Sequence, residues 1–296
     1  MVAMSRALLV VLGGCALDMS GGQPWVPIDE LHGPLVAEAG TTGTAFGRRA
    51  IPTNPLRIAT YNLQYAPDPS ALASALLGDP DLARAGVVLI QEVESHTDEG
   101  RSRAAELADQ LGFGFVYVPA REIEGGTHGL AIMSAFPITD VQRMDLPQAG
   151  LKNQHRIAIQ ASIDVEGHEV HVVDLHLDTM LNTRQRIAQL SPIAVGAPAQ
   201  ALIAGDFNTC WVEWIGGKVP VLSSTRASDQ APVVDDYMRA QGFDTPTIDS
   251  GPTEHMFGLE SRLDSIYTRG YSVTFGGVPR VGPSDHWPMW LDLELP

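Results

Sequence analysis

The sequence has little cysteine and little positive charge. It contains two cysteines, Cys15 and Cys210, among 296 residues, so a framework of several disulfides is excluded. Because Cys15 lies in an N-terminal segment of different composition, we do not expect the two to pair. Lys and Arg number 19 against 35 Asp and Glu, which gives a formal net charge of −16. This deficit argues against tight nonspecific nucleic-acid binding. It does not exclude a nuclease whose bound cations neutralise an acidic cleft.

Several chemical signatures are also missing. No apolar run is long enough to span a bilayer, and no cluster of Cys and His has zinc spacing. A phosphate-binding P-loop and a GxSxG nucleophile elbow are both absent, and the chain has no internal repeat. Hydrophobic residues make up 44% and charged residues 18%, which is typical of a globular protein.

The first fifteen residues resemble an export signal. Met1–Arg6 carries one positive charge, Ala7–Leu12 is apolar, and Gly13-Gly14-Cys15 follows. The run LGGC is similar to the lipobox of bacterial lipoproteins, in which the cysteine is lipidated and becomes the mature N-terminus. We therefore expect a signal peptide at 1–14, a lipid anchor at Cys15 and a place in the cell envelope. Plain secretion and an unprocessed N-terminus remain the alternatives.

Glycine and proline interrupt residues 15–55, which we expect to be an export linker or a wrap over the domain. We expect one domain at 56–296. Apolar patterning predicts its strands and helices. The predicted strands are 56–63, 87–90, 113–118, 128–133, 156–164, 169–176, 201–204, 262–268 and 290–295. The predicted helices are 69–82, 101–111, 183–193 and 233–241. We expect the rest of 210–258 to be irregular.

One stretch organises the rest of the domain, Ala201–Thr209, with the sequence ALIAGDFNT. A short apolar run breaks at Gly205, so it predicts a buried strand that ends in a tight turn. The turn would place the Asp206 carboxylate and the Asn208 amide at the carboxyl end of the strand. Such a pair can hold a water, a phosphate oxygen or a hard cation. An ordinary Asx-type turn is the alternative.

Polar residues recur at the ends of the other apolar runs. The full set is Asn62, Glu92, His176, Asp206, Asn208, Asp264, Asp285 and His286. Taken singly, each is explained by a turn, a solvated strand end or a buried histidine. Together they offer hard oxygen donors, which suit Mg²⁺ or Mn²⁺, and two histidines suited to charge stabilisation and proton transfer. Metal-assisted attack of water on phosphorus needs this combination.

The chain resembles the endonuclease/exonuclease/phosphatase superfamily. That group includes pancreatic-type deoxyribonucleases, abasic-site endonucleases, neutral sphingomyelinases and inositol polyphosphate phosphatases. The matching segments occur in the family's order: TYNLQ (60–64), LIQEVE (89–94), GLAIMSAFPI (129–138), VVDLHLDT (172–179), IAGDFNT (203–209), RLDSIYTRG (262–270) and PSDHWP (283–288). The resemblance implies an α/β fold, a four-layer sandwich of two packed mixed β-sheets flanked by helices.

The resemblance also implies a metal site. Glu92 would be the main metal-binding carboxylate, helped by Asn62 and Asp285, with Mg²⁺ as the ion and Mn²⁺ as a substitute. Some nuclease members carry an acid two residues after the first Asn, where this chain has Gln64. A second metal ligand at that position is therefore missing.

Five residues would carry the chemistry by the same resemblance. Asp206 would orient or deprotonate the attacking water, and Asn208 would hold the phosphate beside it. His176 would contact a nonbridging phosphate oxygen. His286 would act as general base or transition-state stabiliser, held by Asp264 in a carboxylate–histidine pair.

Arg156 and Arg184 are either surface charges or contacts to substrate phosphate. For the whole chain we expect a monomeric, Mg²⁺-dependent hydrolase of a phosphodiester or phosphomonoester. Its acidity and expected anchor favour a phospholipid headgroup or a small phosphate ester slightly. A secreted endonuclease that takes DNA or RNA as substrate is one alternative. A non-catalytic binding protein on the same fold is another.

Overall fold

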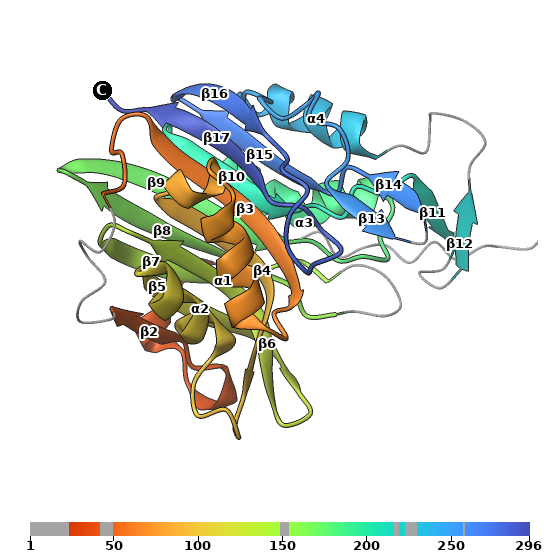
Figure 1. Cartoon of the computed structure of the whole chain (residues 1–296). Helices are drawn as coiled ribbons and strands as arrows, with labels where there is room; N and C mark the ends of the chain where they lie inside the picture. Colours follow the sequence, from red (N-terminus) through yellow and green to blue (C-terminus); the bar gives the residue numbers. More distant parts are fainter. Residues whose placement is uncertain (1–23, 42–49, 149–153, 216–218, 223–229, 257) are drawn as a thin grey trace, which may run out of the picture.

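The computed structural model describes residues 24–41, 50–148, 154–215, 219–222, 230–256 and 258–296. The predicted signal peptide and Cys15 lie outside these ranges. Two β-sheets dominate the described part (Figure 1). In spatial order, the larger sheet consists of β16 (Ser272–Gly277), β17 (Met289–Glu294), β3 (Leu56–Tyr65), β4 (Val87–His96), β6 (Gly126–Ser134), β5 (Gly114–Ile123) and β2 (Glu38–Thr41). The smaller consists of β1 (Val26–Pro27), β7 (Ile138–Asp145), β8 (Ile157–Val165), β9 (His168–His176), β10 (Ala201–Asp206) and β15 (Asp264–Arg269).

Both sheets are mixed. In the larger one β3 and β4 are parallel, and in the smaller one β9 and β10 are parallel, while their other pairings are antiparallel. Two small antiparallel hairpins stand apart at the right of Figure 1. They consist of β11 (Val212–Ile215) with β12 (Val219–Leu222), and of β13 (Glu254–Met256) with β14 (Leu259–Ser261).

Helices cover the two outer faces of the sheet pair. The described helices are α1 (Pro69–Gly78), α2 (Arg103–Leu111), α3 (Thr183–Gly196) and α4 (Ala231–Ala240), with short 3₁₀ turns at Ile28–Glu30, Gly33–Leu35 and Leu82–Arg84. One apolar cluster joins α1 and α2 to the larger sheet, a second joins α3 and α4 to the smaller sheet, and a third fills the space between the sheets. The predicted four-layer sandwich is therefore confirmed. None of the described helices has the length and apolarity needed to cross a bilayer.

At one end of the core between the sheets, the inward-facing strand positions carry polar instead of apolar side chains. In β10, Leu202 and Ala204 pack into the space between the sheets, and the next residue of that face is Asp206. In β9, Val170 and Val172 do the same, so the next residues on their face, Asp174 and His176, continue the row. Apolar side chains thus give way to buried acids, amides and histidines at the carboxyl ends of the parallel strands.

A β-bulge directs Glu92 into the same space. Val88 and Ile90 face α1 and α2, so simple alternation would send Glu92 to that outer face as well. The pairing of β4 with β6 slips between Ile90 and Val93, and Glu92 has a φ of 56°. Val93 returns to the outer face, so the slip rotates Glu92 to the inner one.

Some local predictions were incomplete. The structure contains β7 and β16, which the sequence did not predict. It also contains the β11–β12 hairpin and strand β13 inside 210–258, where we expected irregular chain around one helix, and β14 directly after that segment. Within 15–55, β1 pairs with β7 and β2 pairs with β5, so parts of this segment extend both sheets. The predicted C-terminal end of helix 101–111 is confirmed, because α2 ends at Leu111 and Gly112 caps it with a φ of 74°.

Candidate active site

Backbone pairing places three predicted site residues in one row across neighbouring strands. Asp206 at the end of β10 lies opposite His176 in β9 and opposite Asp264 in β15. The Nε2 atom of His176 lies 3.3 Å from Asp206 Oδ2. All three side chains are at most 2% exposed. The β-sheet ladder, rather than any loop, therefore sets their spacing.

His286 joins this row from the segment before β17. Its Nδ1 lies 2.8 Å from Asp264 Oδ2, and its Nε2 lies 4.0 Å from Asp206 Oδ2. Burial alone would lower the pKa of His286, but the Asp264 carboxylate, and more weakly Asp206, raise it to about 10. The imidazole is therefore cationic at neutral pH, and Asp264 fixes its orientation.

Arg156 determines the tautomer of His176. Its Nη1 lies 2.8 Å from His176 Nδ1. A guanidinium can only donate, so Nδ1 must accept and the ring proton is on Nε2. That Nε2 atom is buried and has no hydrogen-bond partner in the described part of the chain. His176 Nε2 lies 3.3 Å from Asp206 Oδ2, but its N–H is not aligned with that oxygen as a hydrogen bond, so this donor can turn to another acceptor beside Asp206.

Asp206 is held as an ionised acceptor. Burial would raise its pKa, but His176 and His286 hold it below the usual range of an aspartate. Its Oδ1 accepts the backbone N–H of Asn208 at 2.7 Å, and its Oδ2 accepts from Asn62 Nδ2 at 2.9 Å. Asn208 in turn donates its side-chain amide to Leu177 O at 3.0 Å. These contacts fix the turn that follows β10.

The remaining predicted metal ligands lie on the opposite sheet. Glu92 Oε1 is 3.8 Å from His176 Nε2, and no hydrogen bond reaches its carboxylate within the residues described. Asp285 Oδ2 accepts from Gln64 Nε2 at 3.0 Å, so Gln64 orients this acid. Asn62 Oδ1 accepts the backbone N–H of Gln64 at 3.0 Å and keeps a second lone pair. A mostly buried carboxylate without a donor fits a hard divalent cation.

The site opens into one cavity of 480 Å³. Of the predicted set, Glu92, Asp206, Asn208, Asp285 and His286 border it, and Gln64, Tyr65 and Glu254 do so as well. The ligand-type atoms of Asp206, Asp264 and His286 lie within 4.8 Å of one another. All eight predicted residues thus come together, although they span more than two hundred positions of sequence.

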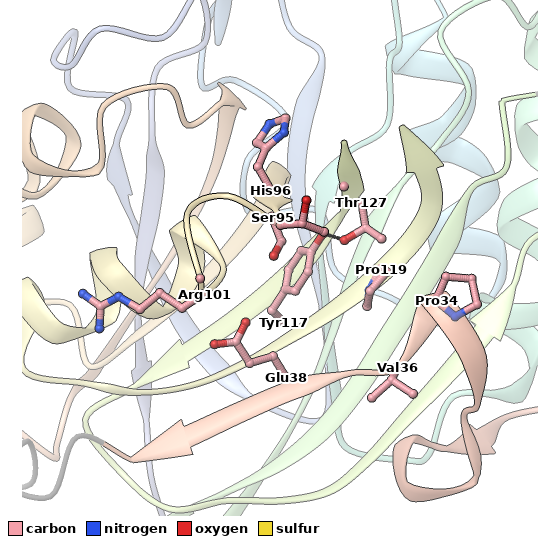
Figure 2. Close-up of a pocket in the computed structure, with 12 residues that line it drawn as sticks. Pro34, Val36, Glu38, Ser95, His96, Arg101, Tyr117, Pro119 and Thr127 are labelled. Carbon is pink, nitrogen blue, oxygen red and sulfur yellow. Dashed lines mark hydrogen bonds between the residues drawn. The ribbon is translucent and has the colours of Figure 1, made fainter. Parts of the chain in front are cut away.

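A second hollow of 350 Å³ shares no lining residue with this cavity. Figure 2 shows Tyr117 at its centre, between Glu38 of β2 and Thr127 of β6. Tyr117 Oη hydrogen-bonds Thr127 Oγ1 at 2.9 Å, and Glu38 Oε2 accepts the backbone N–H of Ser102 at 2.9 Å. Both polar groups are thus engaged in structural contacts, and none of the predicted site residues lies here.

Several residues near the site were missed or undecided. Arg156 is buried and holds His176, whereas Arg184 is exposed and does not line the cavity. Arg186 is fully buried and donates to the carbonyls of Asp178, Thr179 and Phe207, so it ties together the chain after β9 and after β10. A charged residue on a predicted apolar helix face was the available signal for Arg186. No signal in the sequence indicated the position of Glu254.

Two packed mixed sheets with a buried acid–histidine site at the carboxyl ends of their parallel strands define the class of the protein, an α/β sandwich with a polar site at the sheet edge. The chain belongs to the Endonuclease/Exonuclease/phosphatase family, whose model matches residues 59–286. Members of this family include metal-dependent phosphoesterases and nucleases.

Known proteins agree with this assignment. The uncharacterized protein YbhP of Escherichia coli K12 is 28% identical over 203 residues, which cover 64% of this chain and 72% of YbhP. A family protein from Leptotrichia buccalis has a structure with a TM-score of 0.60 at 15% identity, covering 81% of this chain and all of that one. The human Nocturnin catalytic domain gives a TM-score of 0.56 at 17% identity, over 81% and 93% of the two chains. These two structures support the fold alone.

Proposed function

We propose that this chain is a Mg²⁺-dependent hydrolase of phosphate esters. The observation that carries the proposal is the row of His176, Asp206 and Asp264, closed by His286 and facing Glu92, with Asp206, His286 and Glu92 lining one cavity. Phosphoryl transfer needs positioning and charge stabilisation more than covalent chemistry. The row offers both an ionised acceptor and fixed donors.

Each side chain has a role that follows from its contacts. Asp206 is ionised and accepts a hydrogen bond from the attacking water, which it orients toward phosphorus. His286 is cationic, because Asp264 supports its charge, so it stabilises the developing negative charge rather than removing the proton from water. His176 donates its free Nε2–H to a nonbridging oxygen. A Mg²⁺ ion held by Glu92 and Asp285, with Asn62 nearby, would neutralise the phosphoryl oxygens.

The test is hydrolysis of a substrate panel with and without Mg²⁺. The panel contains bis-p-nitrophenyl phosphate, a sugar phosphate, sphingomyelin, plasmid DNA and RNA. We expect turnover that requires Mg²⁺ and falls at least ~10²-fold in Asp206→Asn and in His286→Ala. Circular dichroism and melting temperature of each variant must match the parent.

Three outcomes would contradict the proposal. Activity that survives EDTA, or that survives both substitutions, would refute the mechanism. Complete inactivity over the whole panel would favour a binding protein built on the same fold. Cleavage of plasmid alone would identify the chain as a nuclease instead of a lipid or small-ester phosphohydrolase.

We also propose that the protein is anchored in the cell envelope through a lipid on Cys15. The support is the signal-like patterning of residues 1–15, which lie outside the described structure. The mature protein in membrane fractions should begin at Cys15 and carry the mass of attached acyl chains. An unmodified Cys15 in the intact-mass spectrum would refute the anchor and leave plain secretion and an unprocessed N-terminus as the alternatives.

A further inference from the structure

The cavity beside His286 has an apolar wall that the proposed chemistry does not use. Trp211, Val212, Trp214 and Pro220 contribute to it from the β11–β12 hairpin and the chain just before it. Hydrogen bonds hold this wall in place. Trp211 Nε1 donates to Ser261 Oγ at 3.1 Å. The Asn182 side chain accepts the backbone N–H of Trp214 on its Oδ1 at 2.7 Å and donates its Nδ2–H to the Trp214 carbonyl oxygen at 3.0 Å.

Glu254 faces this wall as an acid without a partner. It lines the cavity, is 5% exposed, and lies opposite His286 in an isolated β-bridge. No hydrogen bond or ion pair reaches its carboxylate in the described ranges, although buried polar groups are nearly always paired. Burial raises the pKa of Glu254 to about 7; the positive charge of His286 acts against this rise, and the nearby Asp285 and Asp206 add to it. Among the described residues, the free energy of burying this acid is therefore offset only by the charge of His286, with no hydrogen bond to the carboxylate.

The position of Glu254 is rigid, so its isolation does not reflect a loose strand. Thr253 Oγ1 accepts the backbone N–H groups of Leu263 and Asp264 at 3.0 Å each. On the other side, His255 N donates to Asp285 O at 3.0 Å, and the His255 ring stacks on Trp287 at 5.8 Å. The strand carrying Glu254 is thus fixed between β15 and the segment that supplies His286.

We propose that Glu254, Trp211 and Trp214 form a subsite for an alkylammonium group of the substrate. The substrate would then be a phosphate ester of an amino alcohol such as choline. The inference rests on the proposed function, because the phosphate must occupy the neighbouring acid–histidine row. Among aromatic side chains, indole faces attract alkylammonium ions most strongly, and a buried carboxylate supplies the matching charge. A neutral alcohol would leave Glu254 unpaired.

Binding of a matched ligand pair tests this subsite without depending on turnover. Phosphocholine and 3,3-dimethylbutyl phosphate have the same shape. They differ at one atom, which is a positively charged nitrogen in phosphocholine and a neutral carbon in the other compound. Their dissociation constants would be measured by calorimetry with Mg²⁺ at pH 8.5. We expect phosphocholine to bind at least about 10-fold more tightly. The ratio should fall below about 3-fold in Glu254→Gln. Glu213→Gln removes an exposed acid from the β11–β12 hairpin, which carries the apolar wall, and should keep the full ratio.

The outcomes separate the subsite from the proposed reaction. Equal affinities in the parent protein, or binding of neither ligand, would overturn the subsite, whatever the hydrolysis panel shows. A preference that Glu254→Gln leaves intact would assign cation recognition to other groups and also overturn it. If Glu254→Gln instead weakens Mg²⁺ binding with the ratio unchanged, Glu254 is a metal ligand. Failure of the panel alone, with the preference present, would refute the reaction and leave the subsite standing.

Discussion

His128→Leu should make the protein more resistant to acid. His128 lies in β6, is 2% exposed, and neither ring nitrogen has a hydrogen-bond partner in the part of the chain described. Burial lowers its pKa to about 2 from an ordinary 6.5, with further lowering by the positive charges of Arg121 and Arg156. The folded protein therefore keeps this ring neutral over a pH range in which the unfolded chain protonates it.

The sign and size of the effect follow from this difference. The unfolded state binds one proton more than the folded state between pH 6.5 and about 2, so the free energy of unfolding falls as pH decreases through that window. The loss is about 1.4 kcal/mol per pH unit, which amounts to about 2 kcal/mol at pH 5. Above pH 6.5 His128 makes no such contribution. His128→Leu removes the titrating ring and two unsatisfied nitrogens, so at pH 7.5 it should be close to neutral or stabilising.

Urea unfolding followed by tryptophan fluorescence measures this effect. The free energy of unfolding of both proteins would be measured at pH 7.5 and pH 5.0 in EDTA. Subtracting the change between the two pH values in His128→Leu from the change in the parent cancels the contributions of the other titrating groups. We expect the parent to lose about 2 kcal/mol more than His128→Leu between the two pH values. Parallel pH dependences with unchanged m-values would refute the account of a buried neutral histidine.

Three other predictions test the site and its scaffold. Arg156→Met should lower kcat at least ~10-fold, because it releases the ring of His176. Arg156→Lys should keep part of the activity. ¹⁵N chemical shifts that show His176 protonated on Nδ1 in the parent would contradict this role. Mg²⁺ at about 100 times its Kd should stabilise the fold by about 2.7 kcal/mol, which would be measured as a rise in melting temperature. Glu92→Gln should abolish most of that rise. An equal rise in both proteins would exclude Glu92 as a ligand. Gly205→Ala should cost about 2–4 kcal/mol in urea unfolding, because Gly205 has a φ of 138° and a Cβ would lie 2.0 Å from Leu175 O. Gly196→Ala meets nothing within 4 Å and should be tolerated, so similar losses for both would refute the steric argument.

The sequence allowed the site to be predicted where a side chain follows directly from strand alternation. Leu202, Ala204 and Asp206 fall on one face of β10 by period two alone. Glu92 was identified by its position after an apolar run, but its direction depends on a bulge with positive φ. Nothing in the residues around it signals that bulge.

What could not be predicted depends on contacts between distant segments. The role of Arg156 arises because β8 lies beside β9, which places its guanidinium next to the ring of His176. The position of Glu254 depends on one β-bridge to His286 across thirty-odd residues. The short hairpins of 210–258 carry many glycines and prolines, so their local patterning favours loop, and only tertiary packing makes them strands.

The reactive row is held by ladder pairing among β9, β10 and β15, whereas the apolar wall belongs to the β11–β12 hairpin and the chain before it, which form a sheet separate from the two large ones. The two parts can therefore change independently. Exchanging residues 211–222 for a loop of other length should alter which alcohols are accepted while the hydrolytic machinery persists. Diversification of such a chain, in nature or in the laboratory, would begin at this replaceable wall.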